Sequence, residues 1–192
     1  MPTPNADALD FLLTRRSRPH KTLSLPVPGE ADLATILTAA ARTPDHGKLE
    51  PWRFIVLERA ALLRLGDLTR TRGAELGKPD DAVAKLAFMF DNAHLSVAVV
   101  ASPKPSEKIP EVEQTLSTGA VCLGLLNAAL ASGWGANWLT GWTAFDRPFL
   151  QDGLGLEETE FVAGFIHLGS ETSAPPERPR PDLAKITQRM SS

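Results

Sequence analysis

Hydrophobic residues are spaced in two ways along the chain, and each spacing predicts a different element. Over residues 30–42, Leu33, Ile36, Leu37 and Ala40 recur at three- and four-residue intervals, which is typical of one face of an amphipathic helix. A shorter apolar pattern predicts a helix over residues 6–15, which Pro19 then stops. Two or three further helices are predicted between residues 59 and 92, at 60–69, 71–77 and 80–92.

Continuous apolar runs predict the strands. Residues 95–101 (LSVAVVA) are rich in β-branched side chains and are followed by Pro103, so they indicate a buried central strand. Shorter strands are expected at 53–58, 136–140 and 161–168, and Gly164 within the last suggests close approach by another group. A single helical turn is expected at 146–150, with Asp146 as its cap. Strands separated by helices in 192 residues predict one compact domain.

The longest helix is expected over residues 111–132. Residues 116–135 carry no charge and are about as long as a membrane-spanning helix. Glycine, serine and threonine dilute their hydrophobicity, however, and no second such run exists in the sequence. We therefore favour a helix buried in the core or at a subunit interface, where small residues permit close contact with several neighbours or with a symmetry mate.

Two stretches carry more chemistry than their elements require. Residues 15–18 (RRSR) present three arginines and a hydroxyl that suit phosphate binding, although a solvated helix end carries the same residue types. Residues 43–51 (TPDHGKLEP), here called the histidine loop, join a helix to a strand and are dense in proline, glycine and charge. Its His46 could be a ligand, a proton donor or a side chain that caps the loop backbone, and spacing alone favours the last.

Composition excludes several classes of function. The net charge of −3 gives no overall attraction to nucleic acid or to an anionic membrane. One cysteine permits no internal disulfide, and no secretory leader is recognisable, so we expect a cytoplasmic protein. The histidines and the cysteine lack metal-ligand spacing, and we predict no metal site.

The familiar catalytic and nucleotide-binding motifs are missing as well. The sequence contains no Gly-x-Gly-x-x-Gly, no P-loop and no Gly-x-Ser-x-Gly elbow. What remains is an enzyme-like chain with an anion-binding stretch and no evident nucleophile, acid or base. A bound cofactor that carries the reactive chemistry would explain this combination, and flavin fits.

Several segments together resemble one known family. They are Arg15-Arg16-Ser17, the run TPDHGKLEPWRF at residues 43–54, Trp138-Leu139-Thr140-Gly141, and Leu168-Gly169 at the end of the last strand. In this order, across almost the whole chain, they resemble the FMN-dependent nitroreductase family, and in particular its small NAD(P)H nitroreductase-like members. The Pro-Asp-His-Gly segment with the following Pro-Trp-x-Phe is the specific part of the likeness.

The resemblance implies an α+β fold, in which helices flank a central mixed β-sheet, and a domain-crossing homodimer with FMN at the subunit interface. It also implies that the proline-rich residues 170–192 extend from the single domain and wrap the partner subunit. Arg15, Arg16 and Ser17 would then hold the FMN phosphate and ribityl chain. Arg180, with Arg178 as its rival, would join the phosphate site.

The same resemblance implies the rest of the cofactor site. Arg42, His46 and Lys48 would contact FMN from the loop region, while Trp138, Leu139 and Thr140 would line the isoalloxazine. Lys48 stands where larger members usually carry asparagine. Glu50 replaces a common glutamine. An added cation would stabilise reduced, anionic flavin, and an added anion would oppose it.

The activity implied is a ping-pong reduction of nitroaromatic or quinone-like small molecules. NADH or NADPH would give a hydride to flavin N5, with no catalytic side chain required. Two alternatives stay open at this point: a non-catalytic flavin- or nucleotide-binding redox sensor, and a family offshoot that acts on flavin itself or on another electrophile.

Overall fold

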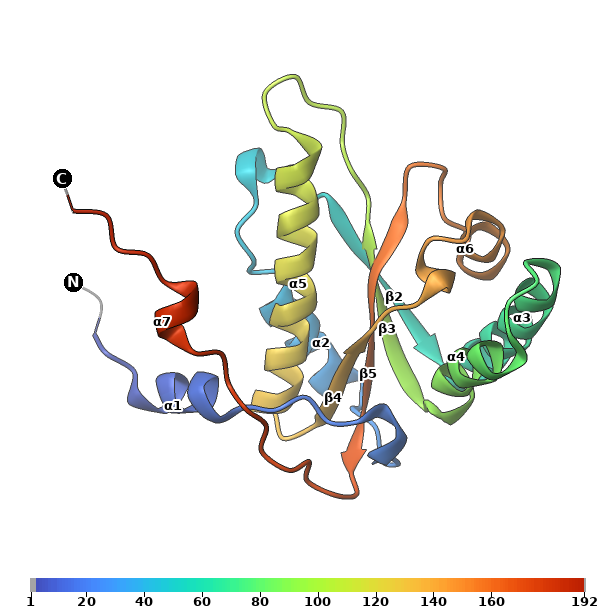
Figure 1. The fold of residues 1–192 in the computed structure, drawn as a ribbon, viewed down its shortest axis with the longest axis horizontal. Helices are drawn as coiled ribbons and strands as arrows, with labels where there is room; N and C mark the ends of the chain where they lie inside the picture. Colours follow the sequence, from blue (N-terminus) through green and yellow to red (C-terminus); the bar gives the residue numbers. More distant parts are fainter. Residues whose placement is uncertain (1–2, 192) are drawn as a thin grey trace.

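The computed structural model describes residues 3–191 as helices packed on both faces of one sheet (Figure 1). In chain order the elements are α1 (Ala6–Thr14), η1 (His20–Thr22, a 3₁₀ helix), β1 (Leu23–Ser24), α2 (Glu30–Ala40), η2 (His46–Lys48, also 3₁₀), β2 (Trp52–Glu58), α3 (Arg59–Glu75), α4 (Asp80–Asn92), β3 (Leu95–Ala101), α5 (Glu111–Ala131), β4 (Gly135–Leu139), η3 (Trp142–Ala144, 3₁₀), α6 (Arg147–Leu154), β5 (Phe161–Glu171) and α7 (Leu183–Ile186). This is the predicted α+β architecture.

The sheet is organised around β5, which pairs with three other strands. β3 lies along one edge of β5 and β4 along the other, while β1 pairs with its last residues and β2 pairs with β3. β3 is the buried central strand that its sequence predicted, because all seven of its residues are buried.

The expectation of a mixed sheet was wrong, since every strand pairing is antiparallel. The connections give the reason. β2 and β3 are joined by the helix pair α3 and α4, which returns the chain to the end of the sheet that it left. α5 does carry the chain from β3 to β4 in the parallel sense, but β5 lies between these strands and runs antiparallel to both.

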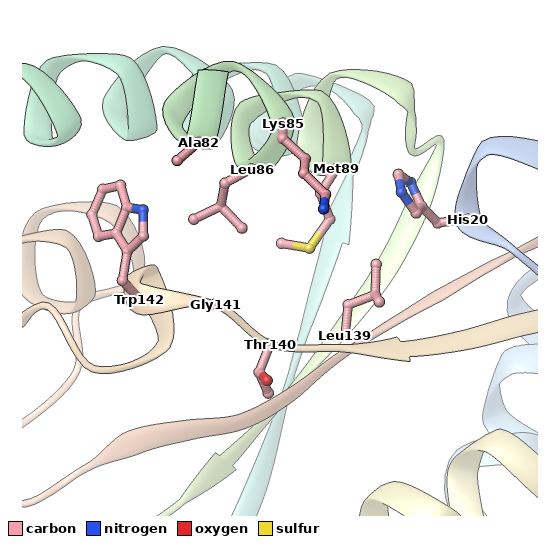
Figure 2. Close-up of a pocket in the computed structure, with 9 residues that line it drawn as sticks. All are labelled: His20, Ala82, Lys85, Leu86, Met89, Leu139, Thr140, Gly141 and Trp142. Carbon is pink, nitrogen blue, oxygen red and sulfur yellow. The ribbon is translucent and has the colours of Figure 1, made fainter. Parts of the chain in front are cut away.

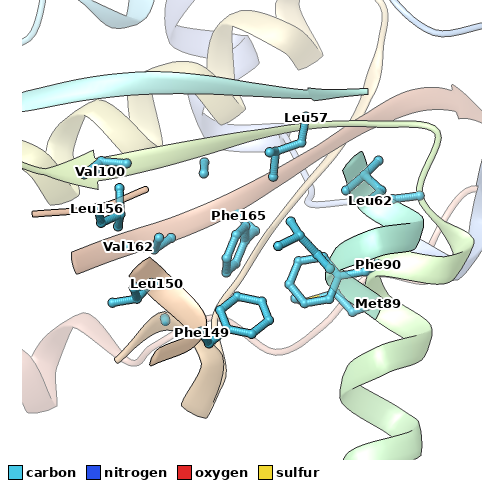
Figure 3. Close-up of a cluster of buried hydrophobic side chains, with 14 residues drawn as sticks. Leu57, Leu62, Met89, Phe90, Val100, Phe149, Leu150, Leu156, Val162 and Phe165 are labelled. Atoms are coloured by element: carbon cyan, nitrogen blue, oxygen red, sulfur yellow. The ribbon is translucent and has the colours of Figure 1, made fainter. Parts of the chain in front are cut away.

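Two hydrophobic clusters occupy the two faces of the sheet. Figure 3 shows the cluster beneath α3, α4 and α6, in which Phe90 lies against Phe149 and Phe165. On the other face, α2 and α5 cover a cluster that includes Ile36, Leu125 and alternate residues of β3 and β5.

α5 is the helix for which burial in the core was favoured. This helix of 21 residues contains an 18-residue window with a mean hydropathy of 1.3, which would suffice for a membrane span, but it packs against α2 and three strands of the sheet. Its outward face is apolar and open in the single chain, with Val112, Leu116 and Leu123 exposed. That face has no partner among residues 3–191.

Several element boundaries differ from the prediction. The helix α6 extends to Leu154, where a single turn ending at residue 150 was expected. α3 is one helix across residues 69–71, because Thr69 and Thr71 direct their hydroxyls to carbonyls four residues earlier instead of interrupting the helix. β5 runs three residues beyond the predicted 168, because Ser170 and Glu171 pair with the two-residue β1.

The two terminal segments lie together and away from the main body (Figure 1). Neither α1 nor α7 contains a buried residue, and apolar side chains of both are largely exposed, among them Leu13, Leu183 and Ile186. Within one chain these helices therefore have little hydrophobic support.

Candidate functional site

Residues 15–18 follow α1 and run along β4. The Arg18 N–H donates to Ala136 O (2.8 Å), and the Asn137 side chain donates to Arg18 O (2.6 Å). These bonds fix the backbone of the segment beside β4, and the three arginine side chains therefore start from fixed positions along this edge of the sheet. A cavity of about 290 Å³ lies at this place, lined by Arg15, Arg16 and Arg18 and by residues at the end of α5.

The C-terminal segment brings a fourth arginine to this place. Arg16 donates to Pro176 O and to Glu177 Oε1 (3.3 Å), and Arg180 Nη2 lies 2.9 Å from the same Glu177 oxygen. One carboxylate is thus shared by Arg16 and Arg180. We call Arg15, Arg16, Arg18 and Arg180 the arginine cluster. Arg178, the alternative to Arg180 for the phosphate site, contacts Glu177 through its backbone N–H, which donates to Glu177 Oε1.

The arginine cluster is electrostatically suited to an anion. Burial, followed by the charges of Arg180, Arg16 and Arg18, lowers the pKa of Arg15. The Arg15 Nε–H is buried and has no hydrogen-bond partner among residues 3–191, while its Nη2 donates to Ser17 Oγ (3.3 Å). An anion with several acceptor oxygens would satisfy the free donor and reduce the mutual repulsion.

A second cavity, of about 280 Å³, lies where the end of β4 meets α4 (Figure 2). Leu139, Thr140, Gly141 and Trp142 form one wall, and the opposite wall is formed by α4 residues including Lys85. His20 closes the end of the cavity towards residues 15–18.

Two polar atoms in the walls of this cavity lack partners. His20 Nδ1 and Trp142 Nε1 are buried, and neither makes a hydrogen bond within the described part of the chain. Burial and the charge of Lys21 lower the pKa of His20, so its imidazole is neutral at pH 7. Lys85 supplies positive charge to an otherwise largely apolar cavity. A ligand with a flat apolar body and polar edges would match these walls.

Trp138 lies on the opposite face of the sheet from Leu139, as neighbouring residues of a strand do. Its indole N–H donates to Ala163 O (3.1 Å), and the ring covers Gly164 so closely that a Cβ there would lie 2.1 Å from Trp138 Nε1. The close approach expected at Gly164 is thereby confirmed. The structure places Leu139 and Thr140, but not Trp138, in the wall of the second cavity.

The histidine loop is at the N-terminal end of α5. His46 Nδ1 lies 2.7 Å from Glu113 Oε2 in the first turn of that helix. The arginine cluster lies beside Leu130 and Gly133 at the opposite end. Leu130 follows Glu113 by seventeen helical steps, which corresponds to roughly 26 Å along the axis of α5.

One chain therefore brings together only part of the predicted site. One group of predicted residues lies along one side of the domain: Arg15, Arg16, Ser17, Arg180, Leu139 and Thr140. A second group is exposed at or near the histidine loop: Arg42, His46 and Lys48. His20, Lys85 and Trp142 line the second cavity but were missed as site residues. No local sequence pattern indicates that Lys85 lies opposite the end of β4.

Comparisons with known proteins identify the family of the chain. The sequence profile of the nitroreductase family matches residues 13–170. The chain is 32% identical over 164 residues to a protein of Escherichia coli K12 named "Putative NAD(P)H nitroreductase YdjA", covering 85% of this chain and 88% of that protein. It is 35% identical over 166 residues to a Haemophilus influenzae protein named "Putative NAD(P)H nitroreductase", with the same coverage of each.

Solved structures share the fold at lower identity. A nitroreductase-like family protein from Bacillus cereus superposes with a TM-score of 0.80 at 21% identity over the full length of both chains. A nitroreductase with bound FMN from Bacteroides fragilis gives a TM-score of 0.75 at 22% identity, covering 97% of this chain and all of the other.

Proposed function

Because the chain belongs to the nitroreductase family, we propose that it is an FMN-dependent oxidoreductase. In this proposal it uses NADH or NADPH to reduce nitroaromatic or quinone-like small molecules, and it works as a homodimer in the cytoplasm. When bound, FMN would supply the redox chemistry, taking a hydride from the nicotinamide and passing electrons to the second substrate in a ping-pong reaction.

The observation that carries the proposal is the carboxylate shared by Arg16 and Arg180. It indicates that these two guanidinium groups, which come from opposite ends of the chain, can converge on one anionic group. A phosphate has more acceptor oxygens than a carboxylate and could also reach the unpaired Arg15 Nε–H. We assign the FMN phosphate to this arginine cluster.

The second cavity suits the ring of the same cofactor. From Arg16 to His20 the chain can span at most about 14 Å, so the phosphate and the ring of one FMN molecule could occupy the two places. Ser17 lies between these residues and can hydrogen-bond to the ribityl linker. The isoalloxazine edges would then meet the free donors and acceptors of His20 and Trp142, with Lys85 favouring negative charge on the ring.

The homodimer follows from what one chain leaves incomplete. His46 and Lys48 cannot reach the arginine cluster of their own chain, since they lie at the far end of α5. The exposed apolar face of α5 and the unsupported α1 and α7 offer the surface that a second copy would cover. In the dimer the histidine loop of each subunit would complete the ring site of the other. The C-terminal segment would lie across the interface.

The chain's own contribution to turnover is binding, orientation and electrostatics. Leu139, whose side chain points into the second cavity, would exclude water from one side of the ring site. Lys48 would favour the reduced, anionic cofactor, and Glu50, two residues later, would oppose it. No nucleophile or general base among the described residues is needed for this chemistry.

The test is the visible spectrum of the purified protein after incubation with FMN. We expect a band near 450 nm that bleaches on addition of NADH or NADPH and returns with a nitroaromatic or a quinone. A colourless protein that cannot be reconstituted would refute the flavin assignment. A coloured protein that neither nicotinamide reduces would indicate a flavin-binding sensor instead.

A further inference from the structure

The contact between His46 and Glu113 joins two parts of the chain that lie 67 residues apart. The imidazole Nδ1 and the carboxylate Oε2 are 2.7 Å apart, which is a short, well-formed hydrogen bond. Glu113 belongs to the first turn of α5, so its backbone is fixed by the longest helix of the fold. His46 is part of an exposed loop, and Glu113 is the partner of its side chain among residues 3–191.

The backbone of the histidine loop is held by bonds to α5 and within the loop. Ser117 Oγ donates to Pro44 O (2.8 Å) and accepts from Trp52 Nε1 (3.2 Å). The Glu50 N–H donates to Asp45 Oδ2 (2.7 Å). These contacts fix the path of the loop from both sides of His46.

Three residues of this loop have left-handed backbone conformations. Gly47 has φ of 72°, Lys48 has 55° and Glu50 has 47°. For the two that carry a Cβ, such conformations persist only when surrounding contacts impose them, and they gather at functional sites. With the backbone so constrained, the freedom left to His46 is rotation of its side chain, and Glu113 is the group that restrains it.

We propose that Glu113 is a positioning residue for His46: it holds the imidazole in the orientation and tautomer in which Nε2 is presented to the FMN bound by the partner subunit. This inference rests on the proposed function, because that function places His46 beside the cofactor. It adds a specific role for a residue that does not itself touch FMN.

The chemistry of the pair fixes the tautomer. An ionised carboxylate can only accept hydrogen bonds, so the Nδ1 of a neutral His46 carries the proton that it donates. Nε2 is then unprotonated and free to accept, and it makes no hydrogen bond with any of residues 3–191. A hydrogen bond made by one ring nitrogen of a histidine commonly determines whether the other nitrogen is protonated.

The experiment compares E113A and E113Q with E111A. Glu111 lies in the same first turn of α5, is exposed and carries the same charge, so E111A reproduces the electrostatic loss without touching His46. Two quantities are measured for each protein: the ¹⁵N chemical shifts of the His46 ring, which report its tautomer, and the dissociation constant for FMN from quenching of flavin fluorescence. The FMN titration is repeated for H46A and for H46A/E113A.

We expect E113A to shift His46 towards the Nε2-protonated tautomer and to weaken FMN binding about three- to tenfold. E113Q keeps an acceptor oxygen and should remain within about twofold of the unmodified protein, as should E111A. In the H46A background, E113A should change the constant by less than about twofold, because Glu113 acts through His46.

Three results would overturn the proposal: E113A indistinguishable from E111A, E113Q as weak as E113A, or an equal effect of E113A with and without His46. A failure of the proposed function gives a different pattern. In that case the unmodified protein would not bind FMN at all, while the ¹⁵N shifts would still report whether Glu113 sets the tautomer of His46.

Discussion

The two ends of α5 hold their residues in place by different means. At the C-terminal end, the arginine cluster consists of long charged side chains from both ends of the chain, and its counterions are Glu171 and Glu177. At the N-terminal end, the histidine loop is fixed through its backbone by Ser117 and Asp45.

This difference suggests that the arginine cluster mainly provides affinity for the cofactor, whereas the histidine loop mainly provides a fixed shape. A cluster of like charges is only moderately stable by itself and gains most when an anion enters it. A braced loop has a defined shape before any ligand arrives. We therefore expect substitutions at the arginine cluster to alter cofactor binding more than stability, and substitutions in the histidine loop to alter stability more directly. Four predictions test this contrast.

The largest effect on cofactor binding is expected from a substitution midway between the two ends of α5. L123D places a charge on the open apolar face of α5, and burying that charge in the proposed interface costs several kcal/mol. We expect the variant to be a monomer in sedimentation velocity. We also expect it to lose FMN binding, because the arginine cluster of one subunit and the histidine loop of the other would no longer meet. L63D is the control, because Leu63 on α3 is similarly exposed (42% against 44%) on the other side of the sheet. A dimeric L123D that retains FMN would contradict the shared interface.

R16A should act on affinity. Loss of a charge-assisted phosphate contact of about 1.5–3 kcal/mol corresponds to a roughly ten- to more than hundredfold weaker affinity for FMN. The urea midpoint of the cofactor-free protein should not change, since within residues 3–191 the Arg16 side chain pairs only with the exposed C-terminal segment. R178A removes the same charge from that segment and should bind FMN normally. If R16A and R178A bind equally well, the cluster is not the phosphate site.

G47A should act on stability. Its left-handed φ of 72° would cost about 1–2 kcal/mol with a Cβ present, and the new Cβ would lie 2.6 Å from Ile109 Cδ1, which must move. Gly77 has a similar φ of 60° with open space around it, so G77A isolates the backbone cost. In urea unfolding, G47A should be the more destabilised of the two. Equal values would show that the loop does not depend on its contact with Ile109.

E177Q should give the smallest effect on FMN binding, and it should strengthen binding where R16A weakens it. The hydrogen bond from the Arg178 N–H and the charges of Arg180 and Arg16 lower the pKa of Glu177, so its carboxylate is ionised and competes with phosphate at neutral pH. Removing that charge should strengthen FMN binding by about two- to fivefold. E158Q makes the same charge change in the loop before β5 and should have no effect. Weaker binding by E177Q would mean that Glu177 organises the arginines instead of competing.

Much of the fold could be predicted because its periodic patterns are strong. β3 is a continuous apolar run and α5 carries no charge from residue 116 onward, and the observed bounds of both differ by no more than one residue from those predicted. β1 could not be found, since two residues carry no period and are a strand only through pairing with Ser170 and Glu171. The antiparallel order depends on β5 entering between β3 and β4, which no local pattern records.

The site was predictable only where its residues are adjacent in sequence. The arginines at 15–18 and residues 138–141 form visible clusters. Lys85 faces residues more than fifty positions away, and Glu113 reaches His46 across a similar separation. A lone lysine or glutamate on a helix has the same local sequence whether it faces solvent or another loop, so only the tertiary structure distinguishes these cases.

The position of β5 also has a consequence for how the protein is made. The strand that unites β1, β3 and β4 is the last to leave the ribosome, so more than four fifths of the chain must be synthesised before the sheet can form. Until then β3, with seven apolar or small residues, lacks the neighbour that covers one of its edges. Sheet assembly is therefore dominated by contacts between distant residues, which slows folding.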